Sequence, residues 1–261
     1  MRPIQWQLQS VNVSVNPLQK IIYKQFAESC EIIGKQRKKK LVTVFVGDAI
    51  EGIHHGSKQF ITARVQEHEK IAEDAIDNGL RMMKHGKDDK FYMVSGTESH
   101  VGESEERIAS DVGPVAYMPA PEDKVTRWCW PMLPVSINGV FGLIAHHGPG
   151  PGSGANEGNP LRNKVRNIVV SRALRGKKAP RFIVFGHKHA KQHIQYEYED
   201  LVVDAFILPS FQGKTDWFYS VDPFAFNNIG MLKIDISAGG DLSWQWLALE
   251  LSEHQEKVEI V

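Results

Sequence analysis

Two hydrophobic periods alternate along this chain of 261 residues and predict a mixture of helices and strands. Apolar positions recur at the 3.6-residue helical period over residues 18–34, 62–85, 104–112 and 161–174. Asn16 and Pro17, before the first of these stretches, are typical of an N-cap and a first helical residue. Short, continuously apolar runs instead predict strands buried within a sheet, at 41–46, 91–94 and 181–185.

Alternation and turn residues predict the remaining strands. Residues 4–15 alternate between apolar and polar but change phase midway, which predicts one half-buried edge strand with a bulge. Asn138-Gly139 favours a tight hairpin between 128–137 and 140–145. Further alternating runs follow at 194–198, 201–207, 231–236 and 244–251. Buried strands interleaved with helices indicate an α/β fold, and the lack of a repeat or a linker predicts a single domain over 1–261.

Composition narrows the class of protein. Hydrophobic residues make up 42% of the chain and charged residues 24%, which is typical of a folded globular protein. Because 31 basic residues balance 31 acidic ones, we expect no overall attraction to nucleic acid or to a membrane surface. Two cysteines are too few for a disulfide framework, and no apolar stretch has the length of a signal peptide or a membrane span. The sequence therefore predicts a cytoplasmic protein without membrane contact.

Metal-capable side chains follow four of the predicted strands, usually next to a glycine. They are Asp48 after 41–46, Thr97, Glu98 and His100 after 91–94, His147 after 140–145, and His187 and His189 after 181–185. The carboxyl ends of strands in an open α/β sheet form the crevice in which ligands bind. Imidazole together with carboxylate suits manganese, iron, nickel or zinc better than calcium. We therefore expect these residues to converge on a metal site.

These motifs resemble the blocks of the calcineurin-like metallophosphoesterases. Gly47-Asp48, His147-Gly148 and Gly186-His187-Lys188-His189 match the Gly-Asp, His-Gly and Gly-His-x-His blocks of that family, and the likeness extends over residues 41–190. The sequences of residues 47–56 and 96–102 are most similar to those of phage-encoded members. The resemblance implies a four-layer α/β/β/α sandwich and, if the gene is carried by a phage, a location in the host cytoplasm.

The same resemblance implies a role for each residue. Asp48 would bridge two divalent metal ions, His147 and His187 would complete the shell of the second ion, and His189 would bind the first. Manganese is the expected metal, with iron, nickel, zinc or magnesium as alternatives. The ions would activate a water molecule for attack on a phosphomonoester or phosphodiester, with nucleic acid among the candidate substrates. His100 would act as the catalytic imidazole, by stabilising charge or by protonating the leaving group.

One block departs from the family in the choice of ligand. Thr97 stands where the family has a metal-binding Asn, and the histidine that normally follows at once arrives three residues later as His100. Either the hydroxyl of Thr97 or the carboxylate of Glu98 would then bind the metal. His55 lies beyond the bridging Asp48 and is a candidate substrate contact. His146 precedes His147, and strand alternation predicts that its side chain points away from the site.

A second departure concerns the first block of the family, Asp-x-His, which does not occur in the sequence. We expect the natural protein or its ancestor to continue upstream of Met1, with the first strand missing here. The second metal site would then be workable and the first one depleted, which could leave a single bound ion and should cost much activity, because two-metal charge stabilisation is a large term in this chemistry. Two alternatives stay open: a non-catalytic module that acts through protein contacts, and a single-metal hydrolase that uses Asp48, His147 and His187.

Overall fold

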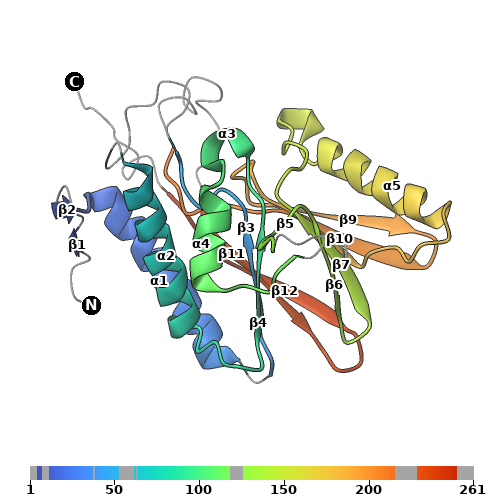
Figure 1. Ribbon diagram of the computed structural model, residues 1–261. Coiled ribbons are helices and arrows are strands. Elements are labelled where there is room, and N and C mark those ends of the chain that lie inside the picture. Colours follow the sequence, from blue (N-terminus) through green and yellow to red (C-terminus); the bar gives the residue numbers. More distant parts are fainter. Residues whose placement is uncertain are drawn as a thin grey trace.

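The computed structural model describes residues 5–7, 12–37, 39–52, 62, 64–117, 126–214 and 228–251. Its elements form two larger sheets with helices outside them, two strand pairs, and short connections (Figure 1). No helix in this described part of the chain is both long and apolar enough to cross a membrane.

The first sheet contains three parallel strands, β3 (Val42–Val46), β4 (Lys90–Val94) and β5 (Cys129–Trp130). Helices α2 (Val65–Met82) and α4 (Ser104–Val112) pack against one face. Their apolar stripes meet the sheet in a buried cluster that includes Ile76, Met93 and Ile108. A short helix, α3 (Glu98–Val101), follows β4, and the pattern of the sequence did not predict it.

The second sheet contains five strands in the order β6-β7-β8-β10-β9. The bounds of its strands are β6 Leu133–Ile137, β7 Val140–Ala145, β8 Phe182–Phe185, β9 Gln192–Tyr198 and β10 Leu201–Ile207. The three central strands β7, β8 and β10 run parallel, while β6 and β9 are antiparallel edges. Helix α5 (Asn159–Ala173) covers one face and buries Leu161, Val165 and Val169 against it. The loop 148–158 before α5 contains one 3₁₀ turn, η1 (Gly154–Asn156).

A third apolar cluster contains side chains of both sheets, with Val94 of the first beside Ile144 and Phe206 of the second. The antiparallel pair β11 (Asn228–Ile236) and β12 (Leu242–Glu250) adds Trp244 and Trp246 to this cluster. Helix α1 (Pro17–Gln36) packs beside α2 and the β11–β12 pair. The two sheets therefore share a core, which fixes the ends of their strands relative to one another.

The α/β class and the main helices predicted from periodicity are confirmed. Asn16 caps α1, because its side chain accepts a hydrogen bond from the Gln19 backbone amide at 2.8 Å. The type I′ hairpin signal is also confirmed, since β6 and β7 pair around Asn138-Gly139 and both turn residues have positive φ.

Two strand predictions were wrong. Residues 4–15 do not form one bulged strand: β1 (Gln5–Gln7) pairs with β2 (Asn12–Ser14) as a separate antiparallel hairpin, and the change of phase falls between the two. The run 128–137 is divided between the sheets, because β5 ends at Trp130 and Pro131 cannot donate a ladder hydrogen bond.

Candidate metal centre

Four strand ends from the two sheets meet at one place and carry the polar side chains there. Asp48 follows β3, Thr97 follows β4, His146 and His147 follow β7, and His187 follows β8. The backbone carbonyl of Val46, the last residue of β3, accepts a hydrogen bond from Nδ1 of His146 at 2.8 Å. This contact joins the first sheet to the second at the site.

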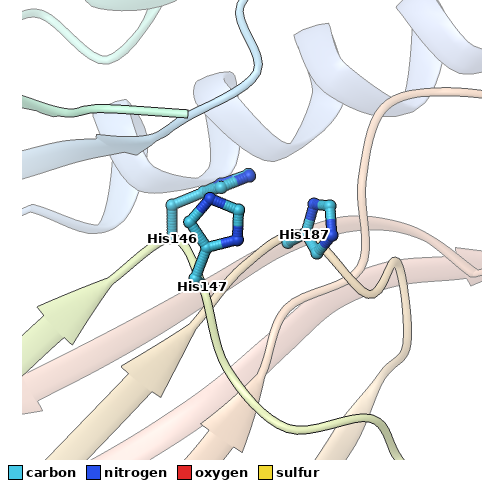
Figure 2. Close-up of side chains that lie close together, drawn as sticks. All are labelled: His146, His147 and His187. Atoms are coloured by element: carbon cyan, nitrogen blue, oxygen red, sulfur yellow. The ribbon is translucent and has the colours of Figure 1, made fainter. Parts of the chain in front are cut away.

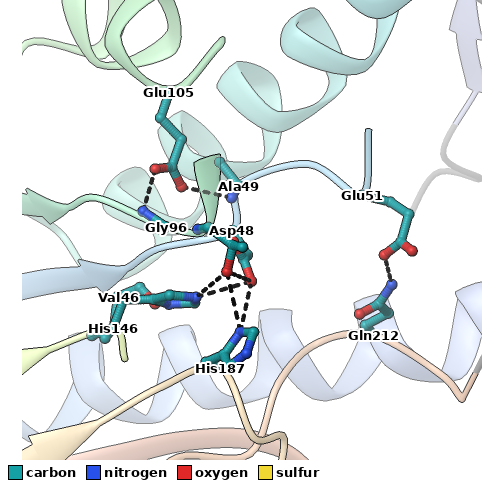
Figure 3. Close-up of polar contacts among 10 residues, drawn as sticks. Val46, Asp48, Ala49, Glu51, Gly96, Glu105, His146, His187 and Gln212 are labelled. Carbon is teal, nitrogen blue, oxygen red and sulfur yellow. Dashed lines mark hydrogen bonds and ion pairs between the residues drawn. The ribbon is translucent and has the colours of Figure 1, made fainter. Parts of the chain in front are cut away.

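The carboxylate of Asp48 is the hub of the group (Figure 3). Its Oδ2 lies 3.0 Å from Nε2 of His146 and 3.5 Å from Nδ1 of His187. Its Oδ1 accepts a hydrogen bond from the backbone amide of Thr97 at 2.7 Å. The Thr97 hydroxyl lies 3.3 Å from His146 Nε2 and 3.2 Å from His187 Nδ1. Contacts between oppositely charged or polar groups from four strands thus converge on one carboxylate.

Unusual backbone geometry brings these groups together. Asp48 and His187 have φ of +55° and +66°, a left-handed conformation that residues other than glycine seldom adopt and that clusters at functional sites. Gly47 has φ of +70°, and a Cβ there would lie 2.4 Å from Nδ1 of His146. A Cβ on Gly96 would lie 2.3 Å from the backbone nitrogen of Asp48. The strand ends approach so closely that only glycine fits at these two positions.

His146 does not point away from the site, so the prediction made for it was wrong. Its ring is 2% exposed and contacts the carboxylate of Asp48 directly. The residue lies just past the end of β7 at Ala145, where the alternation of side chains along a strand no longer applies. Because Nδ1 donates its hydrogen to Val46, the other nitrogen, Nε2, is the one left to accept a proton or a metal ion.

Three imidazoles could hold a metal ion together. One ring nitrogen from each of His146, His147 and His187 lies within 4.8 Å of the other two, and Figure 2 shows the three side chains close together. Their ring centroids are 4.9 to 5.1 Å apart. His146 is buried, His187 is half-buried and His147 is exposed, so the group is open to solvent on one side. An open side is what a catalytic metal requires, because a water or a substrate must also bind it.

Electrostatics in the group favour a cation. Burial alone would raise the pKa of Asp48, but hydrogen bonds from His146, His187 and the Thr97 amide outweigh it and hold that pKa well below its ordinary value. Burial lowers the pKa of His147, and the neighbouring rings of His146 and His187 lower it further. Burial alone would lower the pKa of His146, but its hydrogen bond to Asp48 and the charge of that carboxylate outweigh it and raise that pKa, so a metal ion would displace the proton of this ring. The carboxylate of Asp48 with deprotonated imidazoles is a suitable donor set for a divalent metal such as manganese, iron or zinc. The residues present therefore fit a metal ion.

A buried carboxylate behind the site ties two of its loops together. Glu105 of α4 is 2% exposed, and it accepts hydrogen bonds from the backbone amides of Gly96 at 2.5 Å and Ala49 at 3.0 Å (Figure 3). Burial raises the pKa of Glu105 despite these hydrogen bonds. The sequence analysis missed this residue. Its position three and four residues before the buried Ile108 and Ala109 placed it on the core face of α4 and could have identified it.

The structure brings some of the predicted residues together and leaves others apart. Asp48, Thr97, His147 and His187 lie at the group. Glu98 begins α3 and its side chain is exposed, so of the two candidate ligands Thr97 is the one that contacts Asp48. His189 is half-buried with φ of +48°, but among the described residues it is not one of the three histidines with close ring nitrogens. The backbone of His100 lies in α3, while its side chain and the whole of His55 lie outside the described residues.

Comparison with known proteins gives weak likenesses only. No family model matches the sequence, and no curated protein matches it. Among solved structures, vacuolar protein sorting 29 from Cryptosporidium parvum is 14% identical, over 81% of this chain and 98% of its own, with a TM-score of 0.33. The NAD nucleotidase of Haemophilus influenzae is 12% identical, with a TM-score of 0.41, and the match spans 97% of this chain but 57% of that protein. TM-scores this low do not place the chain in a fold family.

Proposed function

We propose that this chain is a metal-dependent hydrolase that cleaves phosphate esters at the group formed by Asp48, Thr97, His146, His147 and His187. The observation that carries the proposal is the convergence of one carboxylate and three imidazoles from three strand ends, with Thr97 from a fourth. The close approach of Gly47 and Gly96 supports it, because folding alone does not require four polar loops to meet so tightly.

A bound divalent ion would supply charge for the phosphoryl oxygens and would lower the pKa of a coordinated water toward neutrality. Asp48 would hold that charge in place, since the hydrogen bonds that it accepts keep the pKa of its carboxyl group well below the ordinary value. His146 is oriented by Val46, so that Nε2 faces the group. The exposed His147 stands on the side from which a substrate enters. His100 is our proposed proton donor to the leaving alkoxide, and His55 our proposed substrate contact.

The finer assignments are part of the same proposal. We propose a single domain with the four-layer α/β/β/α arrangement of the calcineurin-like metallophosphoesterases, of the phage-encoded type, in the cytoplasm. The helices outside each sheet and the apolar cluster shared by both sheets support that arrangement. Manganese is the proposed metal, as two ions that Asp48 would hold together with the histidines, with His189 as a further ligand. His146 joins His147 and His187 as a ligand in this proposal, because the three ring nitrogens lie together.

The test is turnover of bis-p-nitrophenyl phosphate after loading with Mn²⁺, together with a count of bound metal. The Asp48→Asn variant should lose at least about a thousandfold in turnover, because it removes the charge that holds the metal. The matched control is Asp204→Asn, which changes a carboxylate that also contacts a histidine but lies elsewhere in the second sheet. Turnover that survives in Asp48→Asn, or that is absent with Mn²⁺, Fe²⁺, Ni²⁺, Zn²⁺ and Mg²⁺ alike, would exclude the proposal.

A non-catalytic module is the rival function, and turnover measured together with metal content separates the two. The hydrolase should bind close to two ions, or one ion with weaker turnover, and the bound metal should disappear in Asp48→Asn. A module that acts through protein contacts would bind one ion or none and would show no turnover at any metal loading.

A further inference from the structure

The positive charge of this neutral chain is concentrated in one segment. Residues 158–196 contain ten of the 31 basic residues and none of the 31 acidic ones, which leaves 21 basic against 31 acidic residues elsewhere. The segment comprises α5, the strand β8, the loop that carries His187, and most of β9. We call six exposed basic residues of this segment, those on or near α5 and His187, the basic track. They are Arg162, Lys164, Arg166, Arg175, Lys188 and Lys191.

These cations are available to a partner. None of the six forms an ion pair with an acidic side chain in the described part of the chain, whereas Lys24 and Lys35 on α1 pair with Glu28 and Glu31. Arg162 donates only to the backbone carbonyl of Gln195, at 3.2 Å, and Arg175 binds its own helix at Ser171. Arg162 and Arg166 stand one turn apart, at a spacing where like charges repel. The charges of Arg162 and Arg166 are therefore not neutralised within the fold, and they do not stabilise α5.

The basic track begins beside the candidate metal centre. Lys188 stands between His187 and His189, and Lys191 lies just before β9. The side-chain amide of Gln192 donates to the carbonyl of Pro151 at 2.9 Å, which fixes the loop running from His147 to α5 against β9. From there α5 extends along the outer face of the second sheet, and no helix or strand of the described residues covers its outer side (Figure 1). The 15 residues of α5 span about 22 Å.

We propose that the basic track binds the sugar–phosphate backbone of a nucleic acid and leads it to the metal centre. Phosphates recur at about 3.4 Å along one strand, so about six of them match the length of α5. Arginine guanidinium groups bind phosphate oxygens in pairs, which suits a backbone partner. The proposal rests on the proposed hydrolase only for the cleavage of the bound strand.

The outer face of α5 is less suited to a membrane or to a protein partner. Its apolar stripe of Leu161, Val165 and Val169 is fully buried in the core, whereas a membrane-binding helix turns such a stripe outward. Protein interfaces are centred on aromatic or large apolar anchors, and α5 exposes only Leu174, just past its end. Charge without apolar anchors is the signature of a contact with a polyanion backbone.

The test is binding of fluorescein-labelled oligonucleotides of about 20 nucleotides, single-stranded and duplex, by anisotropy in EDTA at about 0.1 M KCl. Arg162→Gln/Lys164→Gln/Arg166→Gln should weaken binding at least about tenfold, and the slope of log Kd against log salt should fall by about 2 to 3. The control Lys20→Gln/Lys24→Gln/Lys35→Gln removes the same charge from α1 and should change Kd less than about twofold. Circular dichroism checks that both variants fold.

Three outcomes would overturn the proposal: equal losses in the α5 and α1 variants, no oligonucleotide binding even at low salt, or tighter binding to phosphatidylserine vesicles than to either oligonucleotide. Turnover of bis-p-nitrophenyl phosphate separates this proposal from the hydrolase itself. The α5 variant should keep that turnover while losing cleavage of oligonucleotides. Oligonucleotide binding without any turnover would support the basic track as a nucleic-acid site and exclude the hydrolase. Turnover without oligonucleotide binding would support the hydrolase and exclude the basic track as a nucleic-acid site.

Discussion

Two carboxylates in this protein, the half-buried Asp48 and the buried Asp204, each contact a histidine, and the two pairs differ in their surroundings. In one, Asp48 Oδ2 lies 3.0 Å from His146, and in the other, Asp204 Oδ1 lies 2.8 Å from Nε2 of His193. The second pair sits within the ladder of β9 and β10. Phe206 stacks on His193 with ring centroids 4.7 Å apart, and Gln195 donates to the same carboxylate oxygen at 3.1 Å.

The surroundings of each pair determine what it can do. His193 and Asp204 are held by regular strands and covered by Phe206 and Trp244, so their hydrogen bond satisfies buried polar atoms. Asp48 and His146 lie past their strand ends, beside a further exposed imidazole and next to backbone in left-handed conformations. A short carboxylate–imidazole contact is therefore not evidence of a functional site. Convergence of additional donors and backbone strain at the same place is the more informative sign.

The largest expected effect separates the two histidines by activity. His146→Ala should lower both Mn²⁺ affinity and phosphodiester turnover by at least about a hundredfold, because it removes an oriented donor and the support of Asp48. His193→Ala should leave turnover within about twofold of the wild type. Steady-state kinetics and metal titration of both variants provide the measurement. Equal losses of turnover would mean that the two pairs do not differ as we infer.

The second effect runs in the opposite direction and concerns stability without metal. Asp204→Ala should lower the free energy of unfolding by about 2–3 kcal/mol, because it removes two hydrogen bonds to a buried, charged carboxylate, from His193 and Gln195. Asp48→Asn should cost about 1–2 kcal/mol, since Asn tolerates the left-handed backbone and keeps an oxygen for the Thr97 amide but loses the charge that the hydrogen bonds of His146 and His187 stabilise. Urea unfolding in EDTA measures both. A larger loss in Asp48→Asn would contradict the comparison.

A third, smaller effect uses two adjacent glutamates of α4. Glu105 accepts from the amides of Gly96 and Ala49 beside the site, whereas Glu106 accepts from those of Trp128 and Cys129 at β5. Either substitution by Gln should cost about 1–2 kcal/mol of stability, since an amide can accept at one end only. Only Glu105→Gln should also weaken Mn²⁺ binding, by about tenfold or more. Calorimetric titration with Mn²⁺ measures the affinity. An equal loss of affinity in Glu106→Gln would mean that the weaker binding comes from general destabilisation and not from the loops that Glu105 holds.

The smallest effect is a pH dependence of the second pair. Burial would raise the pKa of Asp204, but the hydrogen bonds from His193 and Gln195 outweigh it and lower that pKa. A lowered folded-state pKa stabilises the protein above the ordinary aspartate value of about 3.9, and this contribution is lost as the pH falls below it. The stability of wild type and of Asp204→Asn should therefore converge as the pH is lowered from 6 toward 3. Urea midpoints across that range test it, and a gap that stays constant would show that Asp204 does not titrate as inferred.

Much of this architecture could be predicted from the sequence because it is local. Periodicity and capping residues predicted the helices, and Asn138-Gly139 predicted the hairpin, because each of these signals depends only on residues close together in the sequence. Glycine next to Asp48 and His187 marked the strand ends at which the candidate site lies. The division of 128–137 between two sheets was not predictable in the same way, because it depends on which sheet each half pairs with.

The residues that were missed depend on contacts between distant segments. His146 was misjudged because a rule for strand interiors was applied one residue beyond the strand, and its partner Val46 is 100 positions away. Glu105 acts on two loops that lie 56 and 9 residues before it. Whether Thr97 or Glu98 faces Asp48 was left open by the sequence, because the turn after β4 decides it.

The hydrogen bond between His146 and the Val46 carbonyl ties an imidazole of one sheet to a strand of the other that shares no ladder with it. The ring cannot swing toward an approaching ion without pulling on the end of β3. The packing of the two sheets against each other therefore sets the distances between the residues that would bind the ion. A substitution in the core shared by the sheets, such as Phe206→Leu, would then change metal binding without contacting the site, because it would change the distance between the two sheets.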